Sequence, residues 1–485
     1  MLDTLIASKR EKILSSSSQD RLRQALSEAA QGVASARSKK LAGVRMSPGG
    51  YFAAAALSTF ASLILLRTHR DLAALILVSA SWISVSALVI SDRLNFDGRT
   101  LSRSGPLALL FRVLFGAQRL SIDDVERVEV TALRTLRRGG KVHYRYRIET
   151  SGKGQTFIFA SGGERFRQMV NELLPRLPDY KLDARARELR DYLAPAKAVR
   201  AEAARLGIAP VSVLEETNDA VRSKEKHREA NHQLSSADEA ERAVRLRKVA
   251  NDLRIAGRLR ESAEAFRRAL LICSQDAWLI YEYARLLRSQ ASAFSDARLL
   301  SRACAALKLA TTRSARDPRL LERIGESFLE YAEPARAAKS FRSALEIDEA
   351  AYRAQLGLAE VGLSEGKLAH VIHHYNNATR IAPDKATARM ARGEADYYAR
   401  LNDDDDYLAA ELRRMNWLEG ANRVQHLAAR VSFAALLVAL VGPSIDQLVA
   451  GLGWALASSS IIAWSGALIT KRLLTSRGRV AKNEV

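Results

Sequence analysis

Three histidines, His370, His373 and His374, are the side chains in this sequence whose type and spacing most suggest metal chemistry. Their i, i+3 and i+4 spacing would place the three imidazoles on one face of a helix. No Cys or acidic ligand stands beside them in the sequence, so an exposed polar stripe is the simpler interpretation and no metal is predicted. The four aspartates at 403–406 lack the Gly and Glu spacing of a calcium loop and suit a turn followed by a helix N-terminus.

Catalytic motifs are absent from the sequence. No GxGxxG follows a strand-like run, and the P-loop, GxSxG and HExxH patterns do not occur. Cys273 and Cys304 lie in apolar, helix-patterned sequence without a CxxC unit, so we interpret them as small buried residues in a reducing compartment. Asp446, beside a long apolar run, is the main candidate for an unrecognised intramembrane catalytic group. The sequence therefore predicts a protein that is not an enzyme and that needs no cofactor.

The 485 residues include 75 Lys and Arg against 54 Asp and Glu, a net charge of +21. This length is too great for one compact core and predicts two to four domains. Nucleic acid, an anionic membrane surface or an acidic protein could each balance the charge. Two basic clusters lie beside apolar runs: Lys39, Lys40 and Arg45, and then Lys471, Arg472, Arg477, Arg479 and Lys482. This placement is typical of a membrane topology signal, and no nucleic-acid partner is expected because no nucleic-acid-binding module accompanies the charge.

Two apolar runs without charge lie near the start of the chain. Residues 51–66 and 72–91 flank a short polar stretch at 67–71. About twenty helical residues span roughly 30 Å, the thickness of a bilayer core. The pair predicts a transmembrane hairpin at 47–91, with a buried soluble helix pair as the alternative, after a basic cytoplasmic segment at 1–46.

A second pair of apolar runs, 431–442 and 448–470, lies near the end of the chain. It predicts a transmembrane hairpin at 424–470, followed by a basic cytoplasmic tail at 471–485. Arg430 shortens the first run of this pair and would have to snorkel to the interface for that segment to cross.

Basic residues set the expected orientation. The turn of the second hairpin carries no Lys or Arg whereas both its ends do, so the positive-inside rule places the turn outside. The first hairpin obeys the rule less cleanly, because Arg67 and Arg70 lie in its turn, although its outer flanks are more basic. We expect four uncleaved spans, since no signal peptide is recognisable, with both ends and the whole middle of the chain in the cytoplasm.

Between residues 93 and 178 the hydrophobic pattern changes to a period of two. Val142–Glu149 alternates without a break, residues 121–130 end in a similar stretch, and residues 155–159 form a third strand-like run. An amphipathic helix follows, with apolar side chains at Phe166, Met169, Val170, Leu173, Leu174 and Leu177. Strands closed by one helix predict a small barrel or sandwich.

This segment, 93–178, resembles the bacterial PH-like domain that commonly follows a two-helix membrane hairpin. The resemblance rests on the strand Leu94–Asp97, the segment Leu120–Val125 and the closing helix. It implies an interaction or membrane-proximal adaptor domain without catalysis, in a multi-pass protein of the bacterial inner membrane. Basic residues concentrate on one predicted hairpin: Arg137, Arg138, Lys141, His143, Arg145 and Arg147. They predict contact with anionic lipid headgroups, at about 1 kcal/mol per residue, or an ordinary solvated strand face.

A repeat of 34 residues occupies 243–417, after a charged helical linker at 179–242. Gly325, Ala359 and Gly393 are 34 residues apart. The same offset relates Ala337 to Val371, Phe341 to Tyr375 and Ala344 to Ala378.

These landmarks resemble the tetratricopeptide repeat (TPR), with Val371 as the departure from the family pattern. The resemblance implies antiparallel helix pairs, A and B, stacked into a right-handed solenoid, with small residues where the helices approach and an aromatic residue in the gap. An interval of 41 residues from Ala284 to Gly325 predicts an insertion in the second unit. The unit from Ala386 loses its helix B signature after Asp403 and would serve as a cap or as a bridge to the third span.

The resemblance also implies a concave groove lined by helix A, with exposed positions at Arg247, Lys248, Asn251, Arg254, Trp278, Tyr281, Arg285, Arg288, Arg323, Glu326, Glu360, Glu394, Tyr397 and Tyr398. The first two units are basic there and the later ones turn acidic. Asn251 and its basic neighbours could accept a peptide carboxylate through charge-assisted hydrogen bonds, and a solvated helical face is the alternative.

Together these features predict a mainly α-helical chain: a TPR-like α-solenoid, a small PH-like β domain and two transmembrane helical hairpins. The function they favour is a membrane-anchored, cytoplasm-facing adaptor or scaffold, whose groove binds a partner protein and helps to assemble or regulate a membrane complex. The alternative is a sensor of lipid or envelope state that acts through the β domain, with the repeats as its output.

Overall fold

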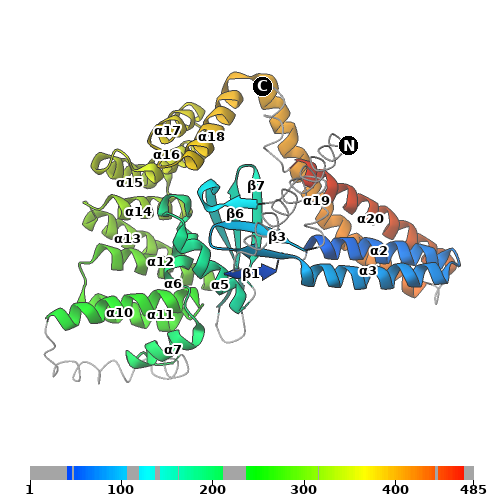
Figure 1. The fold of residues 1–485 in the computed structure, drawn as a ribbon, viewed down its shortest axis with the longest axis horizontal. Helices are drawn as coiled ribbons and strands as arrows, with labels where there is room; N and C mark the ends of the chain where they lie inside the picture. The colour runs from blue at the N-terminus through cyan, green and yellow to red at the C-terminus, as the bar shows by residue number, and fades with distance from the viewer. Residues whose placement is uncertain are drawn as a thin grey trace, which may run out of the picture.

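The computed structural model of the protein describes residues 41–45, 49–105, 119–136, 142–161, 163–210, 236–314, 316–442 and 446–474. Figure 1 shows an array of helices on one side, a bundle of long helices on the other, and a β domain between them. The β domain lies against the inner side of the array. Most of the predicted N-terminal segment (1–40) and of the predicted C-terminal tail (475–485) lies outside the described residues.

The β domain contains two antiparallel sheets. One has the strand order β1 (Ala42–Arg45), β2 (Arg93–Phe96), β3 (Thr100–Ser104) and β4 (Arg119–Ser121). The other has the order β5 (Arg127–Leu136), β6 (Val142–Gly152) and β7 (Gln155–Ala160). Helix α5 (Glu164–Leu173) closes the domain and buries Phe166, Met169, Val170 and Leu173 against it. The structure thus has small antiparallel sheets where the period-two pattern predicted strands.

Alternation along β6 explains how this strand is placed. Tyr146 and Ile148 pack into the domain, whereas Arg145 and Arg147 are exposed on the opposite face. A register shift of one residue would reverse the two faces and bring Ile148 into water. The hydrophobic pattern therefore fixes the pairing with β5, in which Val130 lies opposite Ile148.

A helical hairpin is inserted between two paired strands of the first sheet. Strand β1 precedes α2 (Gly49–Arg67), and α3 (Asp71–Ser91) leads directly into β2. The two strands pair so that Arg45 lies opposite Arg93, at the end from which the hairpin leaves. Residues 42–45 were predicted as part of a basic N-terminal segment, and they are instead a strand. Four residues are too short a run for a period-two pattern to identify.

An ion pair at this junction holds the hairpin to the sheet. Arg103 of β3 donates from Nε and Nη2 to the two carboxylate oxygens of Asp92, at 3.0 and 2.7 Å. The Tyr51 hydroxyl, near the start of α2, donates to the same carboxylate. Asp92 is buried, and bidentate pairs of this kind fix direction as well as distance. The helices therefore leave the β domain at a defined angle.

The array consists of nine described helices: α10 (Ser236–Ile255), α11 (Leu259–Ile272), α12 (Ala277–Phe294), α13 (Ala297–Arg313), α14 (Pro318–Glu330), α15 (Pro334–Ile347), α16 (Tyr352–Ser364), α17 (Leu368–Ile381) and α18 (Lys385–Asp403). Successive helices pair as A and B, so the array is TPR-like. Phe341 of α15 shows why the landmark spacing exists: a Cβ on Gly325 would lie 2.6 Å from its ring, and one on Gly357 would lie 2.3 Å away. Gly393 has open space at its Cβ position, so the third landmark has lost this packing role.

The second repeat unit is longer because both of its helices are longer. Helix α12 has 18 residues and α13 has 17, against 13 and 14 for α14 and α15. The extra turn of α12 ends at Phe294, within the stretch where the 41-residue interval predicted an insertion. Asp296 then accepts a hydrogen bond from the Arg298 backbone N–H and starts α13.

Residues 179–210, predicted as the start of a charged linker, are packed structure. Helices α6 (Ala184–Tyr192) and α7 (Ala196–Arg205) follow the β domain. Val199 and Ala203 of α7 share a hydrophobic cluster with Leu246 and Leu253 of α10. Helix α7 therefore covers the first helix pair, as a solenoid end requires. Residues 211–235 lie outside the described residues.

The bundle is formed by α2, α3, α19 (Asp405–Val441) and α20 (Gln447–Leu474). Phe60 of α2, Ala435 of α19 and Ala457 of α20 are buried together where the two hairpins meet. Within the described residues, three helices are long and apolar enough to cross a bilayer, over Asp71–Val89, Asp405–Val441 and Gln447–Lys471, and Ala54–Arg67 is a shorter apolar helix. Helix α19 begins directly after the last repeat helix, so the boundary predicted between 417 and 424 falls inside one unbroken helix.

Candidate functional site

The inner face of the array is the surface on which the sequence predicted a partner-binding groove. Helices α10, α12, α14, α16 and α18 contribute to it, and residues 179–192 of the same chain lie along it (Figure 1). Four sets of polar contacts and one apolar interface hold this segment, which contains α6, in place. The candidate site is therefore a groove that the chain itself already fills.

Glu188 of α6 is the centre of the first cluster. Its Oε1 lies 3.0 Å from Nη2 of Arg254 on α10 and 2.8 Å from Nε of Arg285 on α12. Arg285 also binds Glu330, at 2.7 Å. Burial alone would raise the pKa of Glu188, but the two guanidinium groups hold it at about 2. The carboxylate is therefore ionised at neutral pH and ties α6 to two repeats.

Arg187, the preceding residue, forms a second cluster of reversed polarity. Its guanidinium binds Glu326 of α14, which also accepts from Nε of Arg353 on α16 at 3.0 Å. Arg187 and Glu326 are 4% and 11% exposed. The two arginines overcome the effect of burial and hold the pKa of Glu326 at about 2. Removing one partner of such a pair leaves an uncompensated buried charge, at a cost of about 3–5 kcal/mol.

The C-terminal end of α6 meets a third set of contacts. The Tyr192 hydroxyl donates to Oε1 of Glu282 on α12, at 2.7 Å. Glu282 is also held by Nε of Arg247, at 2.6 Å, and by Nδ2 of Asn251, at 2.8 Å. Asn251, predicted as part of a pocket for a peptide carboxylate, thus binds a carboxylate of its own array.

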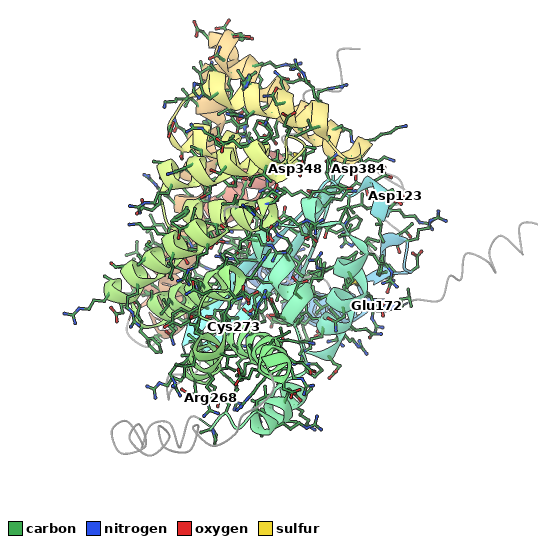
Figure 2. All side chains as sticks on the ribbon, turned by 90° about the vertical axis from the view of Figure 1, so that its left-hand side faces the viewer. Asp123, Glu172, Arg268, Cys273, Asp348 and Asp384 are labelled. Atoms are coloured by element: carbon green, nitrogen blue, oxygen red, sulfur yellow. The ribbon has the colours of Figure 1, made fainter. Side chains whose placement is uncertain are left out.

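The other end of the segment is held at the start of α18. Lys181 Nζ lies 2.8 Å from Asp384, and the Tyr180 hydroxyl donates to the same carboxylate at 3.1 Å. Lys181 also donates to the backbone carbonyl of Asp123, at 3.3 Å, and Figure 2 shows Asp384 and Asp123 side by side there. Lys181 is buried, so this contact closes the far end of the groove.

The opposite face of α6 belongs to the β domain. Leu182, Ala186 and Leu189 are fully buried in the hydrophobic core of that domain. Asp183 caps α6 by accepting from the Ala186 N–H, and its other oxygen accepts from the Val130 N–H of β5. Pulling α6 out of the groove would therefore also expose the β-domain core. The segment is a structural bridge between the two parts.

A cavity of ≈ 390 Å³ remains open between β5, β6, α6 and the first helices of the array. Its lining includes Arg134, Arg185, Arg254, Arg285 and Arg288, with the carboxylates of Glu188 and Glu330. Tyr144 and Tyr146 form part of one wall, with ring centroids 6.1 Å apart. This is the largest space among the described cavities and it has an excess of cationic side chains.

No protein-family model matches this chain, and no curated protein matches it either. Solved structures do match. They include MamA, at 15% identity over 36% of this chain and 94% of that one, with a TM-score of 0.25. They also include YrrB, described as a TPR protein with an unusual peptide-binding site, at 18% identity over 36% of this chain and 88% of that one, with a TM-score of 0.27. The Cut9–Hcn1 assembly matches at 14% identity over 50% of this chain and 45% of that one, also with a TM-score of 0.27.

These neighbours are helical-repeat proteins, but TM-scores this low support no conclusion about the function of this chain. The TPR-like assignment of the array therefore rests on its own helix pairs and on the glycine and aromatic packing around Phe341.

The prediction that the groove residues are exposed is wrong for the middle of the groove. Asn251, Arg254, Tyr281 and Arg285 are at most 5% exposed, and contacts with residues 179–192 or within the array bury them. Further predicted residues are engaged within the chain: Arg247 with Glu282, Trp278 with Asp317, Arg288 with the Glu330 carbonyl, Arg323 with Asp179, Glu326 with Arg187, Glu360 with Arg127 and Tyr397 with Glu411.

Glu360 on α16 is exposed beside Arg127. Two further predicted groove residues stay accessible at the ends of the array. Lys248 is exposed on α10 and Glu394 is half-buried on α18. Neither forms an ion pair with another described residue. Binding of a separate partner by the groove residues stays a prediction.

The structure describes only some of the residues that were predicted to contact lipid headgroups. Arg145 and Arg147 are exposed on the outward face of β6 and form no ion pair with a described carboxylate, and His143 is exposed beside them. Arg137, Arg138 and Lys141 lie outside the described residues.

The three spaced histidines lie on α17 and contact amide side chains. His374 Nδ1 is 2.9 Å from Gln355 Oε1, and His373 Nε2 is 3.0 Å from Asn377 Nδ2. Burial, together with the neighbouring histidines, lowers the pKa of His374 to about 4. Within the described residues, no group of three or more His, Cys, Asp and Glu side chains is arranged to hold a metal.

The role of residues 179–192 was missed at the sequence level. Leu182, Ala186 and Leu189 recur at i, i+4 and i+7, which is a signal for a short amphipathic helix. Nothing in that pattern identifies the second face, on which Arg187 and Glu188 look like ordinary solvated charges. The pairing residues come from helices 66 to 139 positions further along the chain.

Proposed function

We propose that this protein is a membrane-anchored adaptor that presents a helical-repeat array to a partner protein at the bilayer surface. The observation that carries the proposal is the continuity of α19, which starts at the last repeat and ends in the apolar bundle. A single helix that belongs to both parts leaves no flexible linker between the interaction module and its anchor. The partner and the complex that it joins are not identified by these features.

The bundle has the properties of a lipid-embedded anchor. Leu72 and Ile83 of α3, Phe433 of α19 and Leu448 of α20 are each at least 68% exposed, which no water-soluble helix bundle would tolerate over so many positions. Arg67, at the end of α2, lies over the ring of Trp454 near the start of α20. The turns of both hairpins therefore lie at the same end of the bundle. This arrangement supports four spans with every soluble part on one side.

The length of α19 supports a stalk above the membrane. Its 37 residues extend about 55 Å, of which a bilayer core accommodates about 30 Å. About 25 Å of helix is then left to reach through the headgroup region to the array. Trp417 is 66% exposed on this part of the helix, and interfacial tryptophans are typical of that depth.

The cytoplasmic side is the orientation that we propose for the array. Basic residues flank the open ends of both hairpins, and the two cysteines, Cys273 and Cys304, are unpaired, as in a reducing compartment. Labelling of a cysteine introduced at Lys248 in intact cells tests this. We expect no reaction with a membrane-impermeant maleimide until the membrane is permeabilised, and prompt reaction in intact cells would place the array outside.

A partner protein is expected at the parts of the array that residues 179–192 leave uncovered. Lys248 and Glu394 mark the two ends of the inner face where side chains remain accessible. A photo-crosslinking residue at each of these positions should capture a separate protein in cells. Arg302, exposed on the outer helix α13, is the matched control position. Equal capture at Arg302, or none at either inner position, would exclude the inner face as the adaptor surface.

A second candidate function is sensing of anionic lipid through the β domain, supported by the exposed Arg145 and Arg147 on β6. The test needs the whole protein, because β1 and α6 belong to the β-domain core and a 93–178 fragment would lack both. Replacing both arginines by glutamine should weaken association with vesicles containing phosphatidylserine, at about 1 kcal/mol per charge. Unchanged association with the vesicles would exclude lipid sensing through Arg145 and Arg147.

A further inference from the structure

The ≈ 390 Å³ cavity between the β domain and the array has an unbalanced charge. Two of its arginines, Arg254 and Arg285, are neutralised by Glu188 and Glu330 in the ion pairs described above. The other three lining arginines, at positions 134, 185 and 288, have no carboxylate partner among the described residues.

Two of these arginines, Arg134 and Arg288, contact neutral groups. Arg134 donates from Nη1 to the Ser292 hydroxyl, at 2.6 Å. Arg288 donates to the Glu330 backbone carbonyl at 3.4 Å and lies 5.2 Å above the Tyr331 ring. Arg185 is half-buried on α6. Arg134 itself is exposed. Three positive charges therefore line one partly enclosed space and repel one another.

One buried donor at the cavity is also unsatisfied. Nε of Arg254 has no hydrogen-bond partner among the described residues, although this residue is only 5% exposed. A buried unsatisfied N–H is uncommon in folded proteins and points to a missing acceptor. Tyr144 and Tyr146 add a flat aromatic wall beside it.

We propose that this cavity binds a phosphate-bearing small anion, with Arg134, Arg185 and Arg288 neutralising its charge. Guanidinium forks match the oxygen geometry of phosphate and donate paired hydrogen bonds to it. Three unbalanced positive charges favour a ligand with a net charge of about −2 to −3. A single peptide carboxylate carries only one negative charge. The volume lies in the range of small-ligand pockets, so the phosphate belongs to an organic molecule or to a lipid headgroup.

The site is separate from the accessible ends of the groove. A ligand here would contact β5, β6, α6 and α12 at once and so strengthen the joint between the β domain and the array. Binding of a ligand in the cavity would therefore be detected as tighter packing of these four elements.

The test uses the full-length protein in phosphatidylcholine nanodiscs, with pyrophosphate as the soluble probe. Calorimetric titration at constant ionic strength should give saturable binding. Replacing Arg134, Arg185 or Arg288 singly by glutamine should weaken it about tenfold each, the effect of one charge-assisted hydrogen bond. Arg302→Gln, an exposed arginine on α13, should leave the affinity unchanged. The thermal stability of the three unliganded variants should change little, because the repulsion that is relieved offsets the contacts with neutral groups that are lost. This separates lost binding from misfolding.

A second arm distinguishes the two sources of phosphate. Nanodiscs with phosphatidic acid, compared with phosphatidylcholine alone, should slow hydrogen exchange in β6 and α12 if the ligand is a lipid headgroup. Slowing by pyrophosphate and not by phosphatidic acid supports a free organic phosphate. No slowing and no heat with either probe would overturn the proposal. Equal weakening by Arg302→Gln, or tighter binding of a polyglutamate peptide than of pyrophosphate, would overturn it too. None of these outcomes depends on whether the array captures a partner.

Discussion

Replacing Glu188 by glutamine is the sharpest test of the groove that the chain fills itself. In the folded protein Arg254 and Arg285 lower the pKa of this carboxyl from 4.5 to about 2. Each pKa unit is about 1.4 kcal/mol of preference for the ionised form, so the charge contributes about 3 kcal/mol to the docking of α6. Glu188→Gln removes that contribution and leaves the two guanidinium groups with a neutral amide oxygen as their shared acceptor.

Hydrogen exchange measured by mass spectrometry is the appropriate assay, because it reports on α6 separately from the other parts of the protein. Amides of α6 should exchange about a hundredfold faster in the variant, and those of α19 should not change. Glu365→Gln is the matched control. It removes a carboxylate that pairs with Lys367 at 2.8 Å on the open surface, where an ion pair contributes little.

The pH dependence of α6 hydrogen exchange tests whether the ionised carboxylate of Glu188 is the cause of the effect. A carboxylate whose pKa is depressed on folding stabilises the fold above its unfolded pKa and loses this effect as pH falls through the folded pKa. The difference between wild type and Glu188→Gln should thus be constant from pH 8 to about 5 and should shrink between about pH 4.5 and 2. Equal α6 exchange in wild type and variant at pH 7, or an effect no larger than that of Glu365→Gln, would refute the ion-pair bridge.

Three further predictions concern other parts of the chain. Gly257→Ala should loosen the array from the β domain, because its Cβ would lie 1.8 Å from the carbonyl oxygen of Val142 in β6. Gly366 has a similar positive φ but open space at its Cβ position. Hydrogen exchange in β6 should therefore become faster with Gly257→Ala and not with Gly366→Ala. Asp252→Asn should raise the unfolding temperature at pH 8 and not at pH 4. Burial raises the pKa of Asp252 to about 7, so its ionisation costs at most about 4 kcal/mol above that pH. Gly453→Val should lower the unfolding temperature in detergent by separating α19 from α20, since its Cβ would lie 2.6 Å from the α19 backbone, whereas Gly466→Val should not.

The repeat array was predictable because its determinants recur within short stretches. Phe341 and the small residues that receive it are separated by about half a repeat or less, so a fixed offset in the sequence reveals them. The strands after residue 121 were predictable for a similar reason, since alternation is a property of each strand alone. The extra turn of the second unit was detectable as a longer interval, although the sequence did not say that both helices share it.

The filled groove could not be predicted, because its determinants are pairs between distant charges. Arg187 and Glu326 are 139 residues apart, and either residue alone is indistinguishable from a solvated charge. The TPR resemblance made the error larger, since it implies an open groove. Strand β1 was missed for a different reason. Its partner β2 lies beyond the whole of the first hairpin, and four residues carry too little pattern to predict a pairing.

The attachment of the soluble parts at two points has a consequence for how an adaptor of this kind would work. The β domain is joined to α2 and α3 through paired strands and the Asp92–Arg103 ion pair, and the array is joined to the same bundle through α19. Helix α6 then connects the β domain to the array, so the three junctions form a closed loop. A body held at one point can rotate about it, whereas a closed loop restricts both height and tilt. If the bundle is the membrane anchor that we propose, a partner bound to the array is held at a fixed distance and orientation from the bilayer. Weakening α6 should relax that geometry even with all four helices of the bundle intact.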